Sequence, residues 1–329
     1  MIKILREGTL PNILSIAFIG WLRFIPGVDG LISILTHNSG QGIATGSARY
    51  CYSVWLRHLV MARRHGLQVP PPVVAELGPG YSVGVGLAAL ISGSRRYYGL
   101  DVVKYASRAR NITVFDELVA LFKQRADIPD NNEFPGLEPR LESYVFPGDI
   151  LTEERLDRAM AGDRIASIRE NLVHIGTGQD NPIQYVVPWD DAKVIVRESV
   201  DMIFSQSVLE HVEDLQNAYN AQYLWLKPHG FISHSIDFKS HGLARPWNGH
   251  WQYSRFTWAL IRGNRPYLIN RQPFSVHRNL ITMTGLKIIG ELKTPRTDGI
   301  PRHRLAKDWR NLHEDDLTCS GAFIQAVKS

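Results

Sequence analysis

The chain has 329 residues, of which 44% are hydrophobic, and this is enough apolar material for a large core. Its two cysteines, Cys51 and Cys319, exclude a disulfide scaffold and form no metal-ligand spacing, so we expect a reducing, cytoplasmic location. The net charge of +5 is modest for a nucleic-acid enzyme, and the sequence holds no recognisable RNA-binding module.

Residues 1–70 predict a helical N-terminal extension that packs on the main core. Its most apolar stretch, residues 13–35, contains charged residues and a proline. It therefore lacks the roughly 18 uninterrupted apolar residues that a membrane-spanning helix needs. A helix lying in a membrane interface is the alternative for this stretch and would give peripheral membrane contact. The apolar spacing in residues 47–66 predicts a further helix that stops near Gly66.

From residue 71 onward, apolar runs alternate with helical stretches, which predicts crossover connections and a parallel sheet. The polar, then helical stretch 127–181 does not follow this alternation and is interpreted as an insertion. We predict an α/β fold with a doubly wound, mostly parallel, seven-stranded Rossmann-like sheet over residues 71–329. Strands are predicted at residues 73–77, 96–103, 183–187, 200–207, 230–238, 286–292 and 320–328. Helices are predicted at residues 81–93, 110–126 and 208–226.

A glycine turn, "ELGPGYSVG", begins at Glu76 and joins the first strand to the next helix. Glycines let the backbone approach a ligand, and the start of the helix offers free amide groups. Dinucleotide-binding folds hold a pyrophosphate at such a turn, but an acid before the turn favours a cation instead. Asp101 lies twenty-one positions after Gly80, near the spacing of an acid that binds a ribose. A ligand with an ammonium group, a carboxylate and a ribose, such as S-adenosylmethionine, fits both acids.

Three segments resemble class I S-adenosylmethionine-dependent methyltransferases. "VVAELGPGYSVG" resembles the first motif and "YYGLDVV" resembles the second. Residues 198–237, which include "LEHV", resemble the fourth strand, its helix and the fifth strand. Ser82 stands where the first motif usually has its third glycine. The resemblance covers residues 73–240 and the terminal strand pair, and it implies a methyltransferase that uses S-adenosylmethionine.

The resemblance also implies roles for individual residues. Glu76 would face the amino group of the cofactor, directly or through water, and Asp101 would hold the ribose. Trp189 and Asp190 would contact the adenine, with Asp191 as the neighbouring candidate. The residues expected to bind the cofactor are Glu76, Gly78, Pro79, Gly80, Asp101, Val102, Trp189, Asp190, Asp191, Ser205 and Gln206.

Histidines are the candidate bases of the reaction. Displacement at a sulfonium is helped chiefly by positioning, but an oxygen nucleophile often needs a base, and His suits neutral pH. His241 lies just past the fifth strand, where ligands of open parallel sheets bind, and His211 lies on the helix predicted after the fourth strand. His234 and Asp237 complete the catalytic candidates, although His234 also fits a buried, hydrogen-bonded residue.

A metal site is an alternative for this histidine-rich region. His234, Asp237, His241 and His250 are its candidate ligands. Their spacing matches no strong metal pattern, so we expect no metal.

Residues 239–282 are predicted to cover the substrate pocket. The longer stretch 239–290 contains no Asp or Glu but holds many arginines and aromatic residues. Arginines grip anionic groups, and aromatic rings stack on sugars or bases. The alternative is that the rings form a core and the arginines are solvated.

The composition of residues 239–290 indicates the chemical class of the acceptor. We expect O-methylation of a small-molecule or saccharide-type acceptor, with an anionic acceptor compatible. Nucleic acid, a lipid or a quinone are alternative acceptors, and a non-catalytic S-adenosylmethionine-binding protein is the alternative class.

Overall fold

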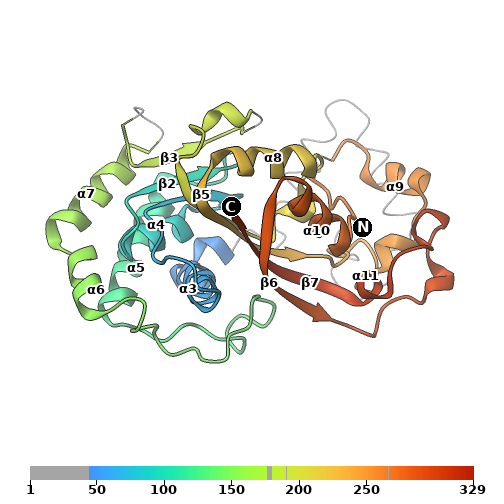
Figure 1. Cartoon of the computed structure of the whole chain (residues 1–329), viewed down its shortest axis with the longest axis horizontal. Helices are drawn as coiled ribbons and strands as arrows, with labels where there is room; N and C mark the ends of the chain where they lie inside the picture. The colour runs from blue at the N-terminus through green and yellow to red at the C-terminus, as the bar shows by residue number, and fades with distance from the viewer. Residues whose placement is uncertain (1–43, 176–179, 190, 266) are drawn as a thin grey trace.

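The structure is a computed structural model that describes residues 44–175, 180–189, 191–265 and 267–329. The apolar stretch 13–35 and Asp190 therefore lie outside the described residues. The described chain forms one seven-stranded sheet with helices on both faces (Figure 1). The strands are β1 (Val73–Leu77), β2 (Arg96–Leu100), β3 (Ile183–Val186), β4 (Val200–Gln206), β5 (Leu226–Asp237), β6 (Leu286–Pro295) and β7 (Cys319–Lys328).

The strand order is β3-β2-β1-β4-β5-β7-β6. The first five strands pair in parallel, whereas β7 runs antiparallel to both of its neighbours. Strands buried on both faces read as nearly continuous apolar runs, and the sequence of β1 is such a run except for Glu76. The predicted doubly wound, mostly parallel sheet is confirmed, including the pairing of the last two strands at one edge.

Helices cover the two faces in two groups. On one face α3, α4 and α5 pack together, and α6 and α7 lie beyond α5 at the left of Figure 1. On the other face α8 and α10 pack together against β4, β5 and β7. The helices are α3 (Ala48–Arg64), α4 (Gly84–Ile91), α5 (Arg108–Lys123), α6 (Glu153–Ala159), α7 (Gly162–Val173), α8 (Leu215–Trp225), α9 (Arg255–Arg262), α10 (Phe274–Met283) and α11 (Glu314–Thr318). The short 3-10 turns are η1 (Ala44–Gly46), η2 (Ala192–Val194), η3 (Leu209–His211), η4 (Gly249–Gln252), η5 (Arg302–Arg304) and η6 (Lys307–Trp309).

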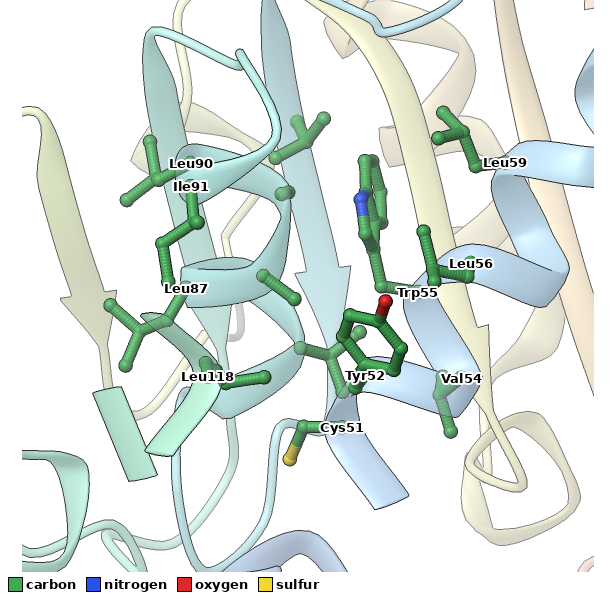
Figure 2. Packing of buried hydrophobic residues seen from close by; sticks show 14 of the residues in the cluster. Cys51, Tyr52, Val54, Trp55, Leu56, Leu59, Leu87, Leu90, Ile91 and Leu118 are labelled. Carbon is green, nitrogen blue, oxygen red and sulfur yellow. The ribbon is translucent and has the colours of Figure 1, made fainter. Parts of the chain in front are cut away.

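Helix α3 belongs to the main core rather than to a separate layer. Ser47 caps its start, because the Ser47 hydroxyl accepts from the amide of Tyr50. Tyr52, Trp55 and Leu56 are fully buried, and Figure 2 shows Tyr52 on the side of α3 toward α4. The part of the N-terminal extension that the structure describes is therefore part of the hydrophobic core on this face.

A buried guanidinium ties α3 to the insertion. Arg57 has no exposed surface, and its nitrogens donate to the carbonyl oxygens of Pro129, Leu137 and Pro139 at 2.8–3.0 Å. It also donates to Oδ1 of Asn131 at 3.1 Å. A buried charge is tolerated only where such hydrogen-bond partners exist. The hydrogen bonds to this one side chain therefore help to fix the conformation of the loop 129–139.

Two predicted helices differ from the structure. The stretch predicted at 208–226 is split, because η3 forms first and α8 starts afresh where Asp214 caps it, accepting from the amide of Asn217 at 2.9 Å. His211 therefore lies on a 3-10 turn and not on a helix. The helical part of the insertion is also divided, into α6 and α7.

Candidate active site

One cavity of about 830 Å³ opens at the carboxyl ends of the parallel strands. Its wall includes the residue that follows or ends each of four strands: Gly78 after β1, Asp101 after β2, Gln206 on β4 and Asp237 on β5. Its volume is within the range of ~300–1,000 Å³ that small-molecule sites occupy. In open α/β sheets ligands bind at this edge.

The glycine turn forms one side of the cavity. Gly78 and Gly80 both have positive φ values, 65° and 72°, which residues with a side chain rarely adopt. A Cβ atom on Gly78 would lie 2.6 Å from Cγ2 of Val208, so the turn also needs glycine for space. Pro79 between them is buried and does not line the cavity.

Thr45 fixes the second half of this turn. Its hydroxyl accepts from the amide of Tyr81 at 2.9 Å, and its carbonyl oxygen accepts from the hydroxyl of Ser82. Ser82 also accepts from the amide of Gly84 at 3.1 Å. The serine that replaces the third glycine of the motif therefore has a structural use, which is to hold the turn against η1.

Asp101 presents its carboxylate to the cavity beside the glycine turn. Its two oxygens accept from the amides of Gly80 at 3.2 Å and Val102 at 2.8 Å. Burial raises its pKa, and the backbone hydrogen bonds oppose that shift. Each oxygen keeps acceptor capacity, so the carboxylate is oriented to bind two neighbouring hydroxyl groups.

Glu76 lies beneath the turn and does not line the cavity. Its Oε2 accepts from the hydroxyl of Tyr97 at 2.7 Å, and the residue is 4% exposed. Burial raises its pKa to about 8, with a smaller increase from the charge of Asp101. A direct contact with the amino group of the cofactor, one of the two arrangements that the resemblance implies, would need a different side-chain rotamer.

The remaining predicted cofactor residues divide into two sets. Val102, Trp189 and Gln206 line the cavity, and the amide of Trp189 donates to the carbonyl of Asp101 at 3.1 Å. Asp191 is exposed and caps η2, accepting from the amide of Lys193. Ser205 is fully buried and does not reach the cavity.

His211 and His241 face each other across the acceptor side of the cavity. Their ring centroids are 5.1 Å apart at an angle of 83°. Nε2 of His241 lies 3.6 Å from Oδ2 of Asp237, and all three residues line the cavity. Burial lowers the pKa of both histidines, to about 4 for His211, so both are neutral at pH 7.

His234 lies away from this group. It is fully buried, and its ring nitrogens are hydrogen bonded to Ser205 at 2.8 Å and Gln222 at 2.7 Å. Burial lowers its pKa to about 3. A base must lie within reach of the proton that it removes, so His234 is not among the proposed catalytic residues.

Two tryptophans of the aromatic and arginine-rich segment pack in buried clusters. Trp251 and Trp258 are buried in two clusters, and the guanidinium of Arg271 lies 4.4 Å from the ring of Trp258. Among the described residues of 239–282, only His241 and Tyr267 line the cavity. The expected arginine grip on an anion is therefore not observed among the described residues.

The charged side chains of the cavity wall are acidic. They are Asp101, Glu213, Asp214 and Asp237, and the described lining contains no Lys or Arg. Low-dielectric walls strengthen the field of such a group. The cavity therefore favours a cationic or neutral ligand over an anion.

Several wall residues were not predicted from the sequence. Thr45 and Tyr50 come from the N-terminal part, and Tyr105 stacks on Tyr81 with ring centroids 5.8 Å apart. Tyr81 could have been predicted from the sequence, because it directly follows the second glycine of the turn. No local pattern marks Thr45, because only the tertiary fold brings it to the turn.

Comparisons with known proteins give structural likeness without sequence likeness. No family model matches the chain, and no curated protein matches it. A methyltransferase structure from Methanosarcina mazei aligns at a TM-score of 0.42 and 11% identity, over 82% of this chain and 96% of the other. One from Mesorhizobium loti aligns at 0.39 and 15%, over 82% and 96%. Phosphoethanolamine N-methyltransferase 2 of Haemonchus contortus, in complex with S-adenosyl-L-methionine, aligns at 0.40 and 14%, over 83% of this chain and 52% of its own.

Proposed function

We propose that the protein is an S-adenosylmethionine-dependent methyltransferase that methylates a hydroxyl oxygen of a small, neutral, saccharide-type acceptor. One observation carries the proposal. A single cavity is lined on one side by the glycine turn and Asp101, and on another by His211, His241 and Asp237. A donor on the first side and an acceptor on the second would share one enclosed space.

The donor side has the groups that the cofactor requires. The carboxylate of Asp101 accepts from the two ribose hydroxyls, while the bare backbone at Gly78 and Gly80 lies under the methionine part. Val102 and Trp189 offer apolar surface for the adenine. The acidic wall suits a ligand that carries a sulfonium and an ammonium group.

The acceptor side supports transfer to oxygen. The pair formed by His241 and Asp237 accepts the hydroxyl proton, and an oxygen lone pair forms the new bond to the methyl carbon. The carbon–sulfur bond breaks at the same time, its electrons pass to sulfur, and neutral S-adenosylhomocysteine leaves. A neutral acceptor is favoured because the described wall holds four acids and no Lys or Arg.

Calorimetry and a turnover assay test the proposal. The wild-type protein should bind S-adenosylmethionine, and Asp101→Asn should weaken that affinity by at least about tenfold, because one charge-assisted hydrogen bond contributes roughly 1.5–3 kcal/mol. Release of S-adenosylhomocysteine should require a sugar glycoside, and Asp237→Asn should lower kcat by about 10²-fold with the cofactor Kd unchanged.

Each alternative gives a different result. Absence of cofactor binding by the wild type would overturn the whole proposal. Binding without turnover, across sugar, nucleic-acid, quinol and amine acceptors, would favour a non-catalytic S-adenosylmethionine-binding protein. Turnover with an amine in place of a hydroxyl would keep the donor side and refute the acceptor class.

A further inference from the structure

Glu210 has an unexplained carboxylate. The residue is 3% exposed, and neither carboxylate oxygen has a hydrogen-bond partner within the part of the chain that the structure describes. Buried carboxylates are costly unless they are paired, hydrogen bonded or bound to a metal. The nearby cation is not its partner, because Lys239 donates to Asp237 at 2.8 Å. Both carboxylate oxygens of Glu210 are therefore available to an added ligand such as a metal ion.

Two histidines complete a set of metal ligands around it. One ligand atom each from Glu210, His211 and His241 lies within 4.8 Å of the others. Two ligands of one zinc ion are separated by up to about 4 Å, so small side-chain rotations bring all three to one ion. Two imidazoles and one carboxylate are a ligand set typical of divalent transition metals.

The geometry of His211 suits a metal ligand. Its Nδ1 lies 2.8 Å from the carbonyl oxygen of Tyr267, so Nδ1 carries the proton and donates it there. The tautomer leaves the lone pair on Nε2 to bind an ion. Ligating histidines usually donate their other nitrogen to a carbonyl or carboxylate in this way, which fixes the ring.

The backbone around the three ligands is held in uncommon conformations. His241 has a φ of 48°, and Ser207 and Tyr267 have φ values of 54° and 60°. Such residues cost of order 1–3 kcal/mol each and gather at functional sites. Asn270 also clamps η3, since its side chain donates to the carbonyls of Leu209 and Val212 at 2.8 Å.

We propose that Glu210, His211 and His241 bind a divalent transition-metal ion of the zinc class at the acceptor side of the cavity. The spacing of these residues in the sequence did not predict this metal site. Glu210 and His211 are adjacent in the chain, whereas His241 lies just after the end of β5. The site itself stands independently of the proposed methyl transfer, but its role in the reaction rests on that function.

In the reaction the ion would bind the acceptor hydroxyl. Coordination polarises the oxygen–hydrogen bond, and the proton passes to the carboxylate of Asp237, which lies beside His241. The oxygen lone pair then attacks the methyl carbon as described above. The histidines serve as ligands in this arrangement, and Asp237 is the base of the pair.

Binding of Co²⁺ to the full-length, metal-stripped protein tests the site without any turnover. We expect visible absorption bands that saturate at one ion per chain and that Zn²⁺ displaces. Glu210→Gln keeps the size of the side chain and should weaken Co²⁺ binding by at least about tenfold. Glu291→Gln is the matched control, because that carboxylate already pairs with Arg278 at 2.9 Å and does not line the cavity, and it should bind Co²⁺ like the wild type.

Two results would overturn the metal site. One is a cobalt spectrum that is the same in Glu210→Gln and in the wild type. The other, which requires no variant, is anomalous diffraction from a zinc-soaked wild-type crystal with no peak between Glu210, His211 and His241. Failure of the proposed function is separate, because it would appear as absent S-adenosylmethionine binding while the cobalt bands persist.

Discussion

The buried carboxyl group of Glu76 should make stability depend on pH in a way that one substitution removes. Its pKa is raised to about 8 from an ordinary value of 4.5, first by burial and then by the charge of Asp101. Between these two pH values the folded protein keeps the proton and the unfolded chain loses it. The free energy of unfolding therefore falls as pH rises through this window.

The magnitude follows from the two pKa values. The cost of Glu76 to the folded state is under about 1 kcal/mol at pH 5 and roughly 4 kcal/mol at pH 8. Glu76→Gln cannot ionise, and its amide oxygen still accepts from the hydroxyl of Tyr97. The stability of the variant relative to the wild type should therefore rise by about 3–4 kcal/mol between pH 5 and pH 8.

Urea denaturation at pH 5, 6, 7 and 8 measures this difference. Other titrating groups, including the buried histidines, cancel because both proteins contain them. Glu154→Gln, at a carboxylate that is 81% exposed, is the control for the substitution itself. A Glu76→Gln difference that stays constant with pH, or that falls, would refute a buried neutral acid at this position.

Three further substitutions test the fold and the site. Gly78→Ala should cost about 2 kcal/mol and weaken S-adenosylmethionine binding by calorimetry, because its Cβ would meet Val208 at 2.6 Å, whereas Gly136→Ala, with open space around it, should do neither. Arg57→Met should cost at least about 3 kcal/mol in urea denaturation, since its hydrogen bonds to four acceptors are lost and the carbonyl of Pro139 loses the side-chain donor that it has, and a loss below 1 kcal/mol would contradict this role. His234→Gln should cost about 2 kcal/mol yet keep kcat, and an unchanged stability with lost turnover would return His234 to the catalytic set.

The sheet was predictable because its strands carry strong local signals. β1 has the bounds that its apolar run predicts, and β4 and β7 differ from prediction by one residue. The glycine turn and Asp101 also lie where the motif spacing indicates. Local pattern was sufficient in these places, because a buried parallel strand is built mostly of apolar residues.

The acceptor side was less predictable because it depends on tertiary contacts. Glu210 and His211 look like helix residues in the sequence, but Asn270, about sixty positions later, holds them on a 3-10 turn. The arginines after His241 suggested an anion site, whereas Arg271 instead donates to the carbonyl of Tyr253 at 2.8 Å and lies against Trp258. Composition gives the residue types of a segment but not the direction in which they point.

Arg57 has a consequence for how this protein can be altered. Its guanidinium donates to the carbonyl of Pro139, which lies 82 positions later in the sequence. The conformation of the loop at the start of the insertion therefore depends on a residue from the segment before the sheet. A chimaera that took either segment alone from a distant protein would leave the charge without acceptors or the carbonyls without a donor. The two segments should therefore be exchanged together, as a matched pair, in any recombined version of this fold.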